Sequence, residues 1–155
     1  MENNRKHWLI RVKDGINFKN SKYNIWGSKR GKHDCIKTII KKIKPEDILW
    51  FFTSKNFGGR CIGMAEYTNF FDRNDEPLVS FHTYGNKELG WNGDEEWDIQ
   101  LHYKDLYITE KQDIKIVIQC AGTVMEYDTF KKKIKDDLYM HYKNYCFYCE
   151  PIYRK

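Results

Sequence analysis

Apolar runs of strand length dominate the hydrophobic pattern of this chain. The turn sequence NFGGR separates DILWFFTS at 47–54 from CIGMAEYTNFF at 61–71, an arrangement typical of a β-hairpin. HWLIRVK at 7–13 has the same branched and aromatic composition and ends at the turn signal Asp14-Gly15. Two later runs, at 97–108 and 114–121, predict further strands.

Helical spacing of apolar residues occurs in two segments. At 33–44, Asp34 is placed as an N-cap, Pro45 follows the end, and one face carries Ile36, Ile39, Ile40 and Ile43. At 129–144, another face carries Phe130, Ile134, Leu138 and either His141 or Tyr142. A short helical turn is expected at about 17–23. Strands outnumber helices, so the pattern predicts an α/β fold of the α+β type, a small and mostly antiparallel sheet or barrel with helices packed on its outside.

The 155 residues fit a single domain, 1–155, because no repeat, linker or composition shift divides them. No stretch reaches the ~20 apolar residues that span a bilayer, and MENNRKHW lacks the apolar run of a signal peptide. Five cysteines, an odd number, favour reduced thiols over a disulfide framework. We therefore expect an intracellular monomer that is neither secreted nor bound to a membrane.

Net charge and aromatic content are each compatible with nucleic-acid binding and with an ordinary globular protein. The formal net charge of +5 favours an anionic partner, but a basic excess also serves solubility. Aromatic residues make up 16% of the chain, which suits a large core as well as the stacking of bases.

Signals of catalysis or metal binding are weak. The histidines stand apart, and neither a metalloprotease helix nor a nucleophile elbow is present. Cys146 and Cys149, with His141 upstream, could begin a zinc site, but a second pair of ligands is lacking, so packing at a helix end is favoured. The acidic residues at 94–98 fit a solvated loop. We expect no enzyme, no cofactor and no metal.

The tryptophans fall into two groups. Trp8 and Trp50 lie within apolar runs, which predicts core positions. Trp26 in KYNIWGS and Trp91 in KELGWNGDEE have polar and glycine neighbours, as in loops. Two loop tryptophans that converge could hold a planar base between them, and each could equally be a core anchor.

Two stretches resemble the YTH domain in order and spacing. KYNIWGSKRGKHDCIK at 22–37 is similar to the family's first strand-turn-helix region, and ILWFFTSKNFGGRCIGMAEY at 48–67 is similar to its central hairpin. WDIQLHYKDLYI resembles a later family strand, so the resemblance covers about 7–108. YTH and the related EVE domains have a PUA-like fold, a small barrel surrounded by helices, and act as readers of modified bases.

The resemblance implies a set of ligand-binding residues. Trp26 and Trp91 would be the walls of an aromatic cage, with Trp97 as the alternative to Trp91 and Leu89 as a third, aliphatic wall. The carbonyl of Gly27 would accept from the exocyclic amine of the base, and further base contacts would come from Lys13, Asp14, Asn17 and Ser28. The nucleic-acid backbone would meet Lys29, Arg30 and Lys32.

The implied function is a non-catalytic reader of methyladenosine in single-stranded RNA. Three alternatives stay open: an EVE-like reader of modified DNA bases, an enzyme on the same PUA-like fold, such as a nuclease or hydrolase, and a protein-interaction module whose aromatic surface binds a peptide.

Overall fold

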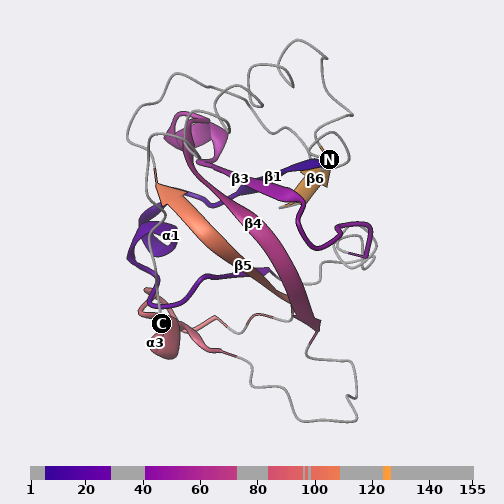
Figure 1. Ribbon diagram of the computed structural model, residues 1–155. Helices are drawn as coiled ribbons and strands as arrows, with labels where there is room; N and C mark the ends of the chain where they lie inside the picture. Colours follow the sequence, from indigo (N-terminus) through magenta and orange to yellow (C-terminus); the bar gives the residue numbers. More distant parts are fainter. Residues whose placement is uncertain are drawn as a thin grey trace, which may run out of the picture.

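A six-stranded sheet forms the body of the protein (Figure 1). The computed structural model describes residues 6–28, 41–72, 84–95, 97, 99–108 and 124–126. The strands run in the spatial order β2-β5-β4-β3-β1-β6. Their bounds are β1 His7–Arg11, β2 Ile25–Ser28, β3 Ile48–Phe52, β4 Cys61–Asp72, β5 Ile99–Ile108 and β6 Val124–Glu126. The short helices are α1 Ile16–Asn20, α3 Asn86–Leu89 and the 3-10 turn η2 Lys55–Phe57.

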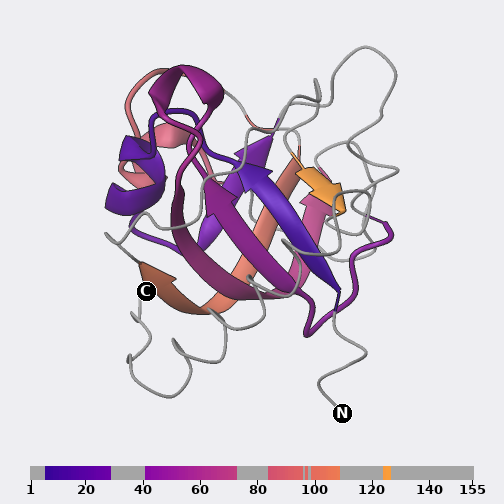
Figure 2. The ribbon, with the colours of Figure 1, turned by 90° about the horizontal axis from the view of Figure 1, so that it is seen from above.

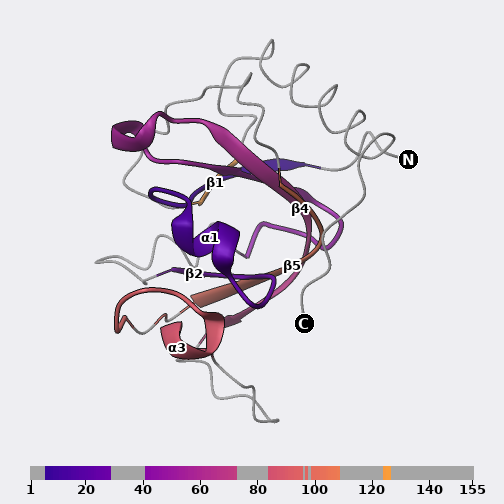
Figure 3. The same ribbon diagram turned by 90° about the vertical axis from the view of Figure 1, so that its left-hand side faces the viewer.

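The sheet curls into a half-barrel, and irregularities in the pairing of β4 with β5 contribute to this curvature. β4 pairs with β5 over most of its length, and the register shifts between Met64 and Glu66 and again between Tyr67 and Asn69. Such irregularities bend a strand and increase its twist. Figure 3 shows the resulting curved wall around α1. Only β1 and β3 pair in parallel, the other neighbouring strands being antiparallel. The prediction of a small, mostly antiparallel barrel of PUA-like fold is therefore confirmed, with the barrel present as a half-barrel.

The core lies on the concave side of the sheet, where α1 closes the open edge (Figure 3). Phe18 of α1 is fully buried and stacks on Phe51 of β3 with ring centroids 4.3 Å apart. The predicted core positions of Trp8 and Trp50 are confirmed, since their exposed fractions are 1% and 0%. Their indole N–H groups donate to Asp47 Oδ2 at 2.9 Å and to His7 Nδ1 at 2.8 Å.

The loop after β1 is fixed to the end of β3 by main-chain hydrogen bonds. Val12 N–H donates to Phe52 O, and Ser54 N–H donates to Lys13 O, each at 2.8 Å. The predicted turn at Asp14-Gly15 is confirmed, because Gly15 has a left-handed φ of 86° and its N–H donates to Val12 O. Figures 2 and 3 show η2 beside α1, so the hairpin tip and the β1 loop form one rim of the molecule.

Several local expectations are corrected. Trp26 lies in strand β2, not in a loop, because residues 25–28 form a ladder with β5. Helix α3 forms inside the segment expected to be a polar loop, and strand β6 was not expected. The predicted strand at 114–121, the helix at 129–144 and most of the helix at 33–44 lie outside the described residues. None of the helices in the described part of the chain has the length and apolar content needed to cross a membrane.

Candidate functional site

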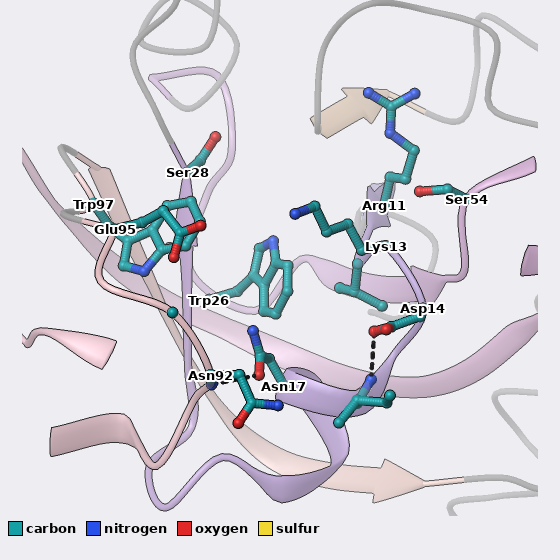
Figure 4. Close-up of a pocket in the computed structure, with 14 residues that line it drawn as sticks. Arg11, Lys13, Asp14, Asn17, Trp26, Ser28, Ser54, Asn92, Glu95 and Trp97 are labelled. Atoms are coloured by element: carbon teal, nitrogen blue, oxygen red, sulfur yellow. Dashed lines mark hydrogen bonds between the residues drawn. The ribbon is translucent and has the colours of Figure 1, made fainter. Parts of the chain in front are cut away.

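A pocket of about 590 Å³ opens between the β1 loop, α1, strand β2 and the segment that follows α3 (Figure 4). Residues from 11–28, from the β3–β4 hairpin at Ser54 and from 92–97 thus meet at one place. Its lining residues are Arg11, Val12, Lys13, Asp14, Ile16, Asn17, Trp26, Gly27, Ser28, Ser54, Asn92, Gly93, Glu95 and Trp97. The volume falls within the range of ~300 to 1,000 Å³ that is usual for small-ligand sites.

Two tryptophans form the aromatic part of the lining. Trp26 is 6% exposed, whereas Trp97 is half-buried. The Trp97 side chain packs directly on the backbone of Gly27: a Cβ atom at residue 27 would lie 2.7 Å from Trp97 Cβ and 2.8 Å from Cδ2. Glycine at position 27 is therefore what allows Trp97 to approach β2.

Trp91 forms a second layer behind this wall. Its ring lies 4.8 Å from that of Trp26, tilted by 40°, and meets Trp97 edge-on at 5.7 Å. Trp26 and Trp91 are therefore in contact, with no gap for a base between them. Trp91 is 5% exposed and Leu89 is fully buried, and neither is among the described residues that line the pocket. Of the two alternatives for the second wall, Trp97 is the one that the structure brings to the pocket.

Asn86, the first residue of α3, holds the outer wall in place. Its Nδ2 donates to Asn92 O and to Glu95 Oε2, both at 2.9 Å. Its Oδ1 accepts from the indole N–H of Trp97. Asn86 is 4% exposed, and its three hydrogen bonds, which are partly buried, go to three pocket-lining residues. Asn86 thus orients the wall without itself lining the pocket.

Asp14 and Asn17 form the polar floor of the pocket. Asp14 Oδ1 accepts from Ile16 N–H at 3.0 Å, which fixes the carboxylate. Asn17 Oδ1 accepts from Asn92 N–H at 3.0 Å. This bond sets the orientation of the Asn17 amide, whose nitrogen points toward Trp26 (Figure 4). The pocket therefore offers an amide donor and a carboxylate acceptor beside an aromatic surface.

Cations line the opposite side. Lys13 and Arg11 extend from the end of β1 and the loop that follows it (Figure 4). Lys13 has a left-handed backbone with φ of 53°, which is unusual for a residue other than glycine. The aromatic wall and the cations thus face one another across the pocket, as in sites that bind a base next to phosphate.

Two indole N–H groups near the pocket have no hydrogen-bond acceptor among the residues that the structure describes. They are Nε1 of Trp26 and Nε1 of Trp91, both buried. Buried N–H groups are nearly always paired in folded proteins. In this respect Trp26 and Trp91 differ from Trp8, Trp50 and Trp97, whose N–H groups are paired.

Burial shifts the pKa of the half-buried His102 and of the buried Cys61, which both lie outside the pocket lining. Burial lowers the pKa of His102 on β5 to about 4, so this imidazole is neutral at pH 7. Burial raises the pKa of the Cys61 thiol to about 12, against a smaller lowering by the hydrogen bond to Gly63 O. Cys61 is therefore a protonated thiol at neutral pH.

Some expected site residues cannot be placed. Lys29, Arg30 and Lys32 lie outside the described residues, as do Cys146 and Cys149. Within residues 6–28, 41–72 and the other described stretches, no three His, Cys, Asp or Glu side chains gather as metal ligands would.

Sequence reasoning missed Asn86, Asn92 and Glu95. Their roles depend on the path of the chain after α3, which no periodic pattern encodes. The acidic run at 94–98 marked the segment but not its part in a pocket.

Comparison with known proteins shows the fold. A mutant of ZmASCH from Zymomonas mobilis has a TM-score of 0.50 at 12% identity, covering 89% of this chain and 97% of that one. The YTH domain of the Zygosaccharomyces rouxii MRB1 protein, solved in complex with N6-methyladenosine RNA, has a TM-score of 0.51 at 14% identity, covering 96% of this chain and 91% of that one. At such identities the likeness extends to the PUA-like fold alone.

Sequence comparison adds little to this likeness. No family model matches the chain. L-arabinose isomerases from Actinobacillus succinogenes and Mannheimia succiniciproducens are 32% and 30% identical over 79 residues, which is 44% of this chain. The chain spans 15% of the length of these curated relatives, so the match indicates no shared family.

Proposed function

We propose that this protein is a non-catalytic reader that binds single-stranded RNA and holds N6-methyladenosine in the pocket lined by Trp26 and Trp97. The observation that carries the proposal is the pocket itself, in which an aromatic wall, an amide donor and two cations converge. The fold shared with a YTH domain solved in complex with N6-methyladenosine RNA supports the choice of ligand.

The chemistry of the lining suits a base attached to a charged backbone. Stacking on an aromatic side chain contributes ~1 to 3 kcal/mol per base. A methyl group buried against the rings adds roughly 0.8 kcal/mol from apolar area, which favours the methylated form over the unmethylated one. The Asn17 amide can donate to a ring nitrogen of the base, and the Gly27 carbonyl is the proposed acceptor of the exocyclic N–H.

The proposed ligand is single-stranded because a paired base cannot enter a pocket. Bases in loops or single strands leave the stack at little cost, whereas a base within a duplex must be flipped out. Lys13 and Arg11 would then lie along the sugar-phosphate backbone beside the bound base.

Binding of short, fluorescently labelled oligonucleotides tests the proposal. We expect a single-stranded RNA with one N6-methyladenosine to bind more tightly than the same RNA with adenosine, by about 3- to 10-fold from the methyl contact. The matching DNA pair tests the alternative ligand, and stronger discrimination in DNA would replace RNA in the proposal. Equal binding of methylated and unmethylated strands of both kinds would overturn it.

Two variants connect this binding to the pocket. Trp97→Ala should weaken binding of the methylated RNA by ~1 to 3 kcal/mol, the contribution of one stacking contact. Phe57→Ala is the matched control, because Phe57 is an aromatic residue that is 54% exposed and lies outside the pocket lining. Equal losses in the two variants would show that the base does not bind at Trp97.

A further inference from the structure

We propose that the indole N–H of Trp26 donates a hydrogen bond to an acceptor atom of the bound base. Trp26 would then select the base by the edge of its ring as well as stack on it. This inference rests on the proposed function and adds to it a requirement on the ligand, namely an acceptor at the position that Nε1 faces.

The first support is the hydrogen bonding of the tryptophans. The N–H groups of Trp8, Trp50 and Trp97 donate to Asp47, His7 and Asn86. Trp26 is 94% buried, as its exposed fraction is 6%, yet no described residue offers an acceptor to its N–H. Leaving such a group unpaired costs free energy, which a ligand acceptor would recover.

The second support is the direction of the ring. Figure 4 shows the nitrogen edge of Trp26 directed into the pocket, on the side of Lys13. An ammonium group has donors and no acceptor, so Lys13 cannot pair with this N–H. Lys13 has a flexible stem, and its movement would let an acceptor atom of the ligand reach the indole.

The burial of the Trp26 N–H favours an acceptor on the base over a phosphate oxygen. The N–H is shielded from solvent, and bringing a phosphate there would strip water from a charged group. A ring nitrogen is neutral and loses less hydration. Adenine has such acceptors at N1, N3 and N7, and methylation of its exocyclic amine leaves all three in place. The site thus calls for a base with an unblocked ring acceptor.

Removing the donor and the acceptor in turn tests this pairing. The donor is removed by Trp26→benzothienylalanine, introduced at this one position, which keeps the ring size and replaces N–H by sulfur. The acceptors are removed one at a time with the 1-deaza, 3-deaza and 7-deaza forms of N6-methyladenosine in the same RNA. We expect one deaza ligand to bind the wild-type protein ~3- to 10-fold more weakly and the variant with no further loss.

Trp91→benzothienylalanine is the matched control. Its N–H is equally buried and unpaired, but Trp91 does not line the pocket among the described residues. This variant should respond to every deaza ligand as the wild type does. Thermal unfolding provides a readout that a structural role would move: Trp26→benzothienylalanine should not lower the melting temperature, because no hydrogen bond within the protein is lost.

The possible outcomes distinguish a failure of the hydrogen bond from a failure of the proposed function. If the wild type prefers the methylated RNA but no deaza ligand couples to Trp26, the hydrogen bond is overturned and the proposed function stands. Coupling to a methylphosphonate linkage in place of a deaza base would assign the N–H to phosphate and overturn the inference. If the wild type shows no preference for the methylated base in RNA or DNA, both proposals fail.

Discussion

Two pairs of tryptophans in this protein are almost equally buried and differ in hydrogen bonding. Trp8 of β1 and Trp50 of β3 are exposed by 1% or less, and both N–H groups are paired. Trp26 and Trp91, beside the pocket, are exposed by 6% and 5%, and neither N–H has an acceptor in the described part of the chain. The two pairs therefore differ little in burial, whereas the hydrogen bonding of the indole nitrogen separates them.

The comparison also resolves a choice that the sequence poses. Trp26 is either a core anchor or a pocket wall when judged from its neighbours in the chain. In the structure it packs on Trp91 and lines the pocket at the same time. The two roles are compatible because one ring edge can face the core while the other faces the cavity.

The largest effect is expected for the paired tryptophans. Trp50→Ala should lower the free energy of unfolding by ~3 to 5 kcal/mol, because it leaves a cavity and removes the hydrogen bond to His7. Denaturant unfolding measures this loss. The folded fraction should bind RNA as the wild type does, and a specific loss of RNA affinity at full folding would show that the two regions are not separate.

Asn86→Ala should have the next largest effect, and on the pocket. The substitution removes three partly buried hydrogen bonds, each contributing ~1 kcal/mol, so a loss of roughly 2 to 3 kcal/mol is expected, divided between stability and binding. The indole N–H resonance of Trp97 should shift in the free protein.

Lys87→Ala, at the next and exposed position of α3, is the control and should change neither quantity. An unchanged Trp97 resonance in Asn86→Ala would contradict the positioning role. Asn86→Asp keeps the acceptor for Trp97 and loses the amide donors, so it should shift this resonance less.

Acidification should lower the free energy of unfolding through His102, which lies on β5 opposite Ile25 of β2. The pKa of His102 is about 4 in the folded protein and 6.5 in an unfolded chain, so the unfolded state binds more protons between these values. Stability should be complete above pH 6.5 and fall as the pH decreases toward 4. Because the ring is only half-buried, we expect ~1 to 2 kcal/mol.

Unfolding at several pH values measures this slope. His102→Phe removes the titrating group and should flatten it in this window. The same slope in both proteins would assign the pH dependence to other groups.

Lys13→Ala should give the smallest effect. It should weaken methylated and unmethylated RNA alike and reduce the salt dependence of binding by ~1 phosphate contact. Lys104→Ala is the control, since Lys104 pairs with Glu66 at 3.1 Å and lies outside the pocket lining. A change in preference for the methylated base would mean that Lys13 contacts the base.

Local patterns predicted the parts of the fold that local contacts stabilise. The hairpin of β3 and β4 was clear because two apolar strands flank a glycine turn. Strand β2 was missed because Gly27 and polar neighbours are typical of a loop, and its pairing with β5 joins residues more than 70 positions apart. The parallel pairing of β1 with β3 is likewise a long-range contact that no local spacing signals.

The candidate site was predicted in its residue types more than in its geometry. Asp14, Asn17, Gly27 and Trp26 do meet at one pocket. The choice between Trp91 and Trp97 could not be made from the sequence, because it depends on which ring packs on Gly27 in space. Asn86 could not be found either, since its three partners come close only when the segment after α3 folds back.

The position of β2 has a consequence for the time that a ligand stays bound. β2 ends the sheet order, with β5 as its neighbour, and it is only four residues long. Short edge elements open at much lower free energy than the centre of a sheet. Trp26 lies on this strand, so the rate at which β2 detaches sets an upper limit on the lifetime of the complex. Amide hydrogen exchange in β2 and the dissociation rate of RNA should therefore slow down together when the ladder to β5 is strengthened.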